Sequence, residues 1–380
     1  MSARMMHRSL VRAALAGAHV FAWIGAFQFA YARTGSIAEA FAGVALTYAL
    51  MHTIMILLTP LAARNMRHGS RRTLEAAVLC AAAAFAALGG VYLIGDSALA
   101  LGMLAFAILM GAYRALYYVP YELSGPQEAR SFFAEICIAL MPAIAGVALA
   151  TAWNMPAALY IGAAFLIVCS LPFVFHLRDT CEGFSWGYRE TFHELFDVEN
   201  RSLLKSSLYE GLEATALLLV WPIAIWMMLD GSYPLLGVVM SATFLFTMLA
   251  RSVLKRFRLY PSPRMAGIVH VSGWILRLFA GSAAAVLIID IYSHAGSEPR
   301  KKGLDIMSFE HSSDNHTYVD EYTALKEMGQ ALGRILMCGV VVVLAASNSV
   351  LLILAGAFAI AALGGWLAIH AAHAHTRGPL

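Results

Sequence analysis

The feature that most constrains this chain is its succession of long apolar stretches. Each is about 20 residues long, the length that an α-helix needs to cross roughly 30 Å of hydrocarbon. Apolar residues make up 60% of the 380 residues and charged residues only 13%, whereas a soluble domain carries about 25% charged residues. A soluble fold would need a core far larger than one domain offers. The sequence therefore predicts an all-α protein embedded in a membrane.

Gly, Pro and charged residues divide the apolar sequence into twelve predicted spans. They cover residues 10–31, 36–63, 73–94, 97–120, 132–153, 157–176, 203–228, 234–254, 264–281, 283–296, 322–345 and 348–371. The stretch 264–296 is short for two spans, so a protein with eleven spans is the alternative. One span there would put the basic segments 251–264 and 300–302 on opposite sides of the membrane, against the usual bias of Lys and Arg. We therefore favour two short helices.

Basic residues are concentrated in alternate turns between the predicted spans. The segments 4–12, 64–72 and 251–264 are rich in Arg and Lys, whereas the turns 95–97 and 154–156 are short and almost uncharged. Because Lys and Arg mark the cytoplasmic side of a membrane, both termini are predicted to be cytoplasmic, in the inner membrane of a bacterium. The basic N-terminus has no convincing cleavage site, so we expect a retained first helix.

The two halves of the sequence resemble each other. The segment 61–64, before a basic turn, matches 249–251, and the segment 131–142 matches 323–334, both at a shift of about 190 residues. Parallel six-helix repeats, related by an axis along the membrane normal, are one architecture of secondary transporters. The repeat therefore predicts two similar bundles.

We expect the chain to have three parts. Residues 1–176 form one six-helix bundle, and residues 203–380 form the other. Residues 177–202 form a cytoplasmic linker between them. The linker contains five aromatic side chains, which indicates an amphipathic segment on the membrane surface or against the bundles rather than a disordered tether.

These features together resemble the major facilitator superfamily, in the number of helices, the central linker and the sidedness. Segment 60–72 keeps the basic turn and Gly69 of the family's loop between helices two and three, but it lacks the acidic residue. Segment 141–146 is similar to the Gly-Pro-x-x-Gly-Gly motif of the family's antiporters. The resemblance implies a secondary active transporter that moves a small organic solute, an anion being one candidate, by alternating access. It slightly favours export by antiport.

Ionisable side chains inside the hydrocarbon are energetically expensive, so each is a candidate for function. They fall on the first, fourth, seventh and tenth spans, with Arg277 on the ninth as an exception. The candidates are His19, Arg114, Glu210, Glu213 and Asp290. The family resemblance implies that these four helices line the central cavity.

Arg114 is the main candidate for binding the solute, because a planar guanidinium suits carboxylate and phosphate groups. Tyr117 and Tyr121 lie one helical turn apart, and Tyr118 shares the helix face of Arg114. Together they predict an anion-binding wall. The alternative is a structural ion pair between Arg114 and a carboxylate of the seventh or tenth span, or a side chain that extends to the cytoplasm.

Further candidates for contact with the solute carry aromatic or amide groups. His19, Trp23 and Gln28 form a polar stripe on the first span, and Trp221 lies on the seventh. Polar side chains in membrane helices also bond neighbouring helices, and that interpretation stays open at this point.

Glu210 and Glu213 are candidates for carrying a coupling proton. They are three residues apart and share a helix face, so their carboxylates repel and one of them is expected to take up a proton. The alternative is that both are wetted at the cytoplasmic mouth. Asp290 is either a third coupling site or the partner of Arg114 or Arg277. The coupling ion is expected to be H⁺, with Na⁺ as the alternative.

Charged residues near the predicted cytoplasmic ends of the spans are candidates for a gate. Glu135, at the inner end of the fifth span, is predicted to pair with Arg64 or Arg67. Glu327 and Arg334 are seven residues apart on one face of the eleventh span and are predicted to form the matching pair.

Other classes of protein fit the sequence less well. It has no G-x-S-x-G, no H-E-x-x-H and no dense His cluster, so we do not expect an enzyme. A channel would not need a duplicated bundle. A non-transporting receptor or assembly factor on the same scaffold is an alternative, as is a copper importer that uses Met51 and Met55. We expect no cofactor, no resident metal, no nucleic-acid partner, and a monomer in the lipid bilayer.

Overall fold

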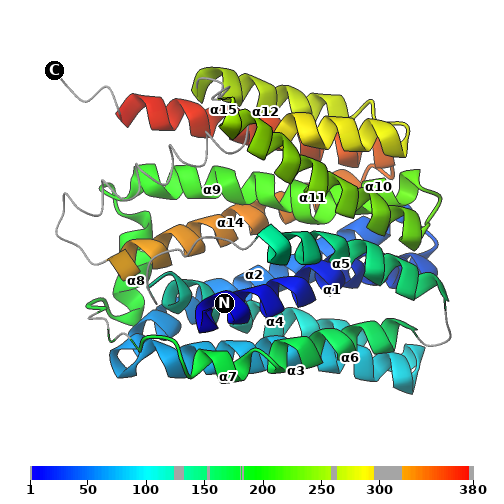
Figure 1. Ribbon diagram of the computed structural model, residues 1–380. Helices are drawn as coiled ribbons and strands as arrows, with labels where there is room; N and C mark the ends of the chain where they lie inside the picture. The colour runs from blue at the N-terminus through cyan, green and yellow to red at the C-terminus, as the bar shows by residue number, and fades with distance from the viewer. Residues whose placement is uncertain are drawn as a thin grey trace.

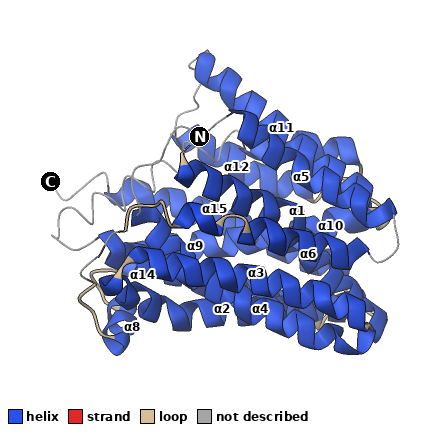
Figure 2. Ribbon diagram, turned by 60° about the horizontal axis from the view of Figure 1, so that its bottom comes forward, coloured by secondary structure: helices blue, strands red, loops and turns tan. Residues whose placement is uncertain are grey.

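The computed structural model describes residues 2–123, 132–151, 155–179, 181, 184–257, 263–294 and 319–375. All regular secondary structure within these ranges is helical (Figure 2). Ten helical segments there are long and apolar enough to cross a membrane. The chain is therefore an all-α, multi-pass membrane protein, as its apolar stretches predict.

A helix occupies each predicted span. In the first half the helices are α1 (Ala3–Thr34), α2 (Ile37–Asn65), α3 (Ser70–Ile94), α4 (Leu99–Leu123), α5 (Phe132–Thr151), α6 (Met155–Val168) and α7 (Leu171–Val174). The predicted linker contains α8 (Tyr188–Phe196). The second half has α9 (Arg201–Thr215), the π-helical turn η3 (Ala216–Val220), α10 (Trp221–Met228), α11 (Tyr233–Arg256), α12 (Pro263–Arg277), the helix Ala283–His294, α14 (Val319–Ala345) and α15 (Val350–His375).

The short stretch 264–296 contains two helices. α12 ends at Arg277, and the next helix begins at Ala283. Turn hydrogen bonds connect Ile275 to Leu278 and Arg277 to Ala280, where the helical ladder stops. The division into two short helices agrees with the interpretation favoured from the charge pattern.

Several connections between helices are tight turns with left-handed backbone. The positive φ angles are 68° at Gly35, 52° at Asp230, 75° at Gly231 and 54° at Asn348. Gly adopts this conformation freely, and Asp and Asn adopt it more readily than other residues. These residue types therefore reverse the chain within a few residues between α1 and α2, α10 and α11, and α14 and α15.

Most of the helices run side by side along a common direction, and α8 lies across that direction at one end of the bundle (Figure 1). Within the first half, α1 packs against α2, α5 and α6, and α3 packs against α4 and α6. Within the second half, α9 packs against α14 and α15, and α12 packs against α15. Contacts between the halves run mainly along two helix pairs, α2 with α14 and α5 with α11.

Glycines allow close backbone approach where α5 meets α11. A Cβ atom added at Gly146 would lie 2.3 Å from the Tyr233 carbonyl oxygen, and one added at Gly237 would lie 2.3 Å from that of Pro142. The Ala143 backbone N–H also donates to Ser241 Oγ at 2.9 Å. Small residues that bring two backbones together are the usual basis of helix pairing in membranes.

Candidate functional site

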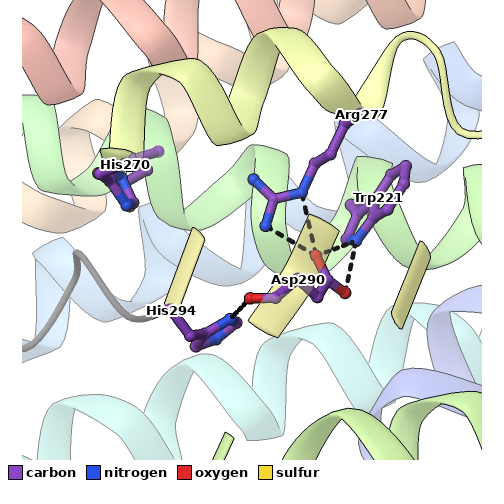
Figure 3. Close-up of polar contacts among 6 residues, drawn as sticks. Trp221, His270, Arg277, Asp290 and His294 are labelled. Carbon is purple, nitrogen blue, oxygen red and sulfur yellow. Dashed lines mark hydrogen bonds and ion pairs between the residues drawn. The ribbon is translucent and has the colours of Figure 1, made fainter. Parts of the chain in front are cut away.

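A network of charged side chains is buried inside the second half of the chain. Arg277 of α12 forms an ion pair with Asp290, with Nη2 and Oδ1 2.9 Å apart, and Trp221 Nε1 donates to both carboxylate oxygens at 3.1 Å. The Arg277 guanidinium also lies 4.1 Å from the centre of the Trp274 ring. Figure 3 shows Arg277, Asp290 and Trp221 converging. The structure therefore supports the interpretation in which Asp290 is the partner of Arg277.

A second acidic group in this region has a titratable partner. Glu213 Oε1 of α9 lies 2.8 Å from His270 Nε2 of α12, and both side chains are buried. His294, one turn beyond Asp290, is hydrogen-bonded through Nδ1 to the Asp290 carbonyl oxygen at 2.8 Å (Figure 3). The sequence-based candidates omitted both histidines. Their spacing could have revealed them, because His270 is seven residues from Arg277 and His294 four from Asp290, which are same-face separations on a helix.

The π-helical turn η3 lies between Glu213 and Trp221. Eight residues of regular α-helix at 3.6 residues per turn would leave two side chains about 80° apart. One extra residue in a π-turn removes most of that difference. The irregular turn thus lets Glu213 and Trp221 both face the charged network, and such bulges occur frequently at functional sites.

Glu210 contacts a different helix from Glu213. Its Oε2 accepts a hydrogen bond from Gln330 Nε2 of α14 at 2.8 Å, whereas Glu213 contacts His270 of α12. The prediction of two carboxylates that act on each other in one pocket assumed only their separation along the helix. The structure directs them to separate neighbours.

Arg114 of α4 is buried where α2, α4 and α14 meet. Met55, Ala115 and Ala331, one from each of these helices, form a common packed cluster. The charges of both Arg114 and Arg334 act on Tyr48 and His52 of α2. Among the tyrosines of α4, Tyr113 and Tyr118 interact electrostatically with Arg114. The placement of Tyr118 agrees with its predicted helix face.

The two tyrosines of the predicted wall, Tyr117 and Tyr121, contact α1. Tyr117 is hydrogen-bonded to His7 Nε2 of α1 at 3.2 Å and stacks on Tyr121 with ring centres 5.1 Å apart. Arg4 Nη2 donates to the Tyr121 carbonyl oxygen at 3.1 Å. The two tyrosines therefore fasten α4 to the start of α1. Tyr117 and Tyr121 lie about one and two helical turns beyond Arg114 along α4. At that level of the helix the neighbour is α1.

The polar stripe of α1 bonds within the protein. Trp23 Nε1 donates to His19 Nε2 at 3.4 Å, and the Trp23 ring is buried against Tyr48. Gln28 Oε1 accepts a hydrogen bond from the Tyr233 hydroxyl of α11, which connects the two halves. The Gln28 and Trp221 contacts correspond to the alternative of bonds to neighbouring helices, whereas the Trp23–His19 contact lies within α1. Met51 and Met55 are likewise buried in the core, where thioethers fill space.

Solved structures share this helix arrangement over nearly the whole chain. The xylose transporter XylE from E. coli, in a partially occluded inward open conformation, matches with a TM-score of 0.65 and 12% identity over 99% of both chains. The nucleoside transporter NupG matches at 0.61 and 12% over 100% of both. The human organic anion transporter MFSD10 matches at 0.61 and 14% over 97% of this chain and 98% of that chain. The chain has the fold of the major facilitator superfamily. No family model and no curated protein matches the sequence.

The loop between α2 and α3 is bonded to an acidic residue that lies more than 100 residues later in the chain. Its expected acidic residue is missing, but Asp179 reaches the start of α3 and accepts a hydrogen bond from the Arg71 backbone N–H at 3.1 Å. A Cβ atom at Gly69 would lie 2.8 Å from Asp179 Oδ1, and φ there is 109°. Gly69 therefore admits the carboxylate that caps α3.

The residues of the first predicted gate pair have other partners in the structure. Glu135 pairs with Arg12 of α1, with Oε2 and Nη2 2.9 Å apart, instead of with Arg64 or Arg67. Arg67 instead donates through Nε to the Phe184 carbonyl oxygen at 2.9 Å, and Arg64 is exposed. The gate prediction used the ends of the spans alone, whereas packing brings α1 beside α5.

The matching pair on α14 is also separated. Arg334 Nη2 donates to Gln330 Oε1 at 3.5 Å, and Glu327 interacts electrostatically with Arg114. The two residues thus contact different groups, although seven residues on a helix put them on one face.

Proposed function

We propose that the protein is a secondary active transporter that moves a small organic solute by alternating access. Residues 1–176 and 203–380 would be two rocking six-helix bundles, joined by the linker 177–202, with both termini in the cytoplasm of a bacterial inner membrane. The fold and the contacts of α2 with α14 and of α5 with α11 support this proposal. Charged groups buried between membrane helices support it further, since they mark solute and ion pathways.

The observation that carries the proposal is the buried contact between Glu213 and His270. Asp290 faces Arg277, whose charge is permanent, so protonating Asp290 would leave an uncompensated cation. Glu213 instead faces an imidazole, whose charge is not permanent. Protonating Glu213 beside a neutral imidazole would leave a neutral pair, so this carboxylate can take up a proton without leaving an uncompensated cation. We assign proton coupling to this pair, with export by antiport as the favoured direction.

The test is proton movement driven by a solute in proteoliposomes that contain a pH-sensitive dye. Organic anions, neutral solutes and cations are added in turn to the outside. We expect a proton flux with one solute class, its loss in Glu213→Gln, and its retention in Glu39→Gln, which removes an exposed carboxylate. Solute uptake that moves no protons would contradict proton coupling and favour Na⁺.

The alternative is a receptor or assembly factor that has kept the fold without transport. Such a protein would bind a solute, detected as a raised melting temperature, yet would produce neither solute uptake nor proton flux in the same vesicles. Binding and flux are therefore measured on one preparation.

A further inference from the structure

We infer that the transported solute is a doubly charged organic anion, held between Arg114 of the first half and Arg334 of the second. The inference rests on the proposed function and specifies its substrate class. It also gives Arg334 a binding role in place of the predicted role in a gate.

Both arginines are buried without adequate partners. Arg114 is 9% exposed and Arg334 8%. Among the described residues, Arg114 Nε, Arg334 Nε and Arg334 Nη1 have no hydrogen-bond partner, and neither arginine takes part in an ion pair. The Gln330 contact at 3.5 Å is at the limit of a hydrogen bond. A buried, unpaired guanidinium is strongly destabilising, so two of them indicate that a ligand completes the site.

The two guanidinium groups share one set of neighbours. His19, Tyr48 and His52 each interact electrostatically with both Arg114 and Arg334. The packed cluster of Met55, Ala115 and Ala331 brings the three helices together beside them. Glu327 is an acidic group that acts on Arg114, whereas no carboxylate of the described residues forms an ion pair with Arg334. An anion with two charges would compensate both arginines.

Additional polar atoms at the same place are also without partners. The Tyr48 hydroxyl and both ring nitrogens of His52 are buried and make no hydrogen bond among the described residues. Buried polar groups are normally satisfied, so each exception requires an explanation. A hydroxyl and an imidazole N–H can donate to anionic oxygens, while guanidinium groups bind carboxylate or phosphate with two parallel bonds. The site therefore has the donors that a dicarboxylate or an organic phosphate needs.

The position of the arginines connects binding to the motion of the halves. Arg114 lies on α4 and Arg334 on α14, and α14 is the helix that packs along α2 across the boundary between the halves. A dianion that contacts both arginines is held tightly only when the halves bring them together. A solute with one charge would satisfy one side and leave the other unpaired.

The experiment measures melting temperature and affinity of the full-length protein in detergent at fixed ionic strength. The probes are succinate with its monomethyl ester, and glycerol phosphate with glycerol, so that each dianion has a matched control. We expect a dianion to raise the melting temperature and the singly charged or neutral analogue to have little effect. Which dianion binds distinguishes dicarboxylate from phosphate recognition. If neither dianion binds, the inference is wrong.

Variants test the two arginines separately. Arg114→Gln and Arg334→Gln should each weaken dianion binding about tenfold or more, while Arg33→Gln, which removes an exposed arginine, should not. Arg114→Lys keeps the charge and should bind better than Arg114→Gln if the protein is folded. Undiminished binding in both Gln variants would overturn the inference. Flux of a neutral solute that these variants do not affect would overturn the inference about the dianion and leave the proposed transport function intact. Arginine-dependent binding of a dianion without any flux would support the binding site and overturn the proposed transport function.

Discussion

At the scale of the residue, the buried charges differ in how well they are compensated. Arg277 and Asp290 neutralise each other, whereas Arg114 and Arg334 have no ion-pair partner in the described part of the chain. Removing one member of a compensated pair leaves a buried charge and is expected to destabilise the protein by about 3–5 kcal/mol. We therefore predict a large loss of stability in Arg277→Met and a partial recovery in Arg277→Met/Asp290→Asn. Reversible unfolding in detergent and SDS measures both, and equal destabilisation in the single and double variants would contradict the pair.

The same reasoning predicts that removing an arginine from the proposed binding site does not lower stability. Without ligand, Arg334→Met should keep or raise the melting temperature, because it removes a buried charge that has no ion-pair partner among the described residues, while filling a similar volume. A fall in melting temperature as large as that of Arg277→Met would mean that Arg334 is already compensated. The two Met variants are compared on one preparation, without added anions.

At the scale of the element, apolar length was enough to predict where helices lie. It placed the start of the first helix at residue 10, although α1 begins at Ala3, because arginines near the N-terminus favour helix outside the hydrocarbon as well. The partners of the charged side chains could not be predicted in this way. They depend on which distant helices pack together, as Glu135 with Arg12 and Tyr117 with His7 illustrate.

The close contact of α5 with α11 gives a prediction at this scale. Gly146→Ala places a Cβ atom against the Tyr233 carbonyl, and a backbone atom cannot move aside without displacing a helix. We expect a loss of about 1–3 kcal/mol from overpacking. Gly162→Ala is the control, since a Cβ atom there has no atom within 4 Å, and it should be neutral or slightly stabilising. Equal melting temperatures for the two variants would show that the α5–α11 contact tolerates the added volume.

At the scale of the whole molecule, the segment 184–196 contacts both halves on one side of the bundle. Its Phe184 carbonyl accepts from Arg67 beside α2, and the Ser185 backbone N–H donates to Glu321 Oε1 of α14 at 2.9 Å. The Phe184 ring is buried among residues that include Met66 and Ala324, one from each half. The proposed rocking of the halves would change the distance between these two anchoring points.

The Glu321 contact is therefore expected to govern how firmly this segment holds the halves together. Glu321→Ala removes the acceptor for two Ser185 groups, the backbone N–H and the hydroxyl at 2.6 Å, while leaving the Arg67 contact in place. We predict faster amide hydrogen exchange in residues 184–196, because the segment loses a hydrogen-bonded restraint on the α14 side and opens locally more easily. Glu39→Ala, at an exposed site far along the chain, should leave that exchange unchanged. Unaltered exchange in Glu321→Ala would mean that the Phe184 packing and the Arg67 contact hold the segment without help from Glu321.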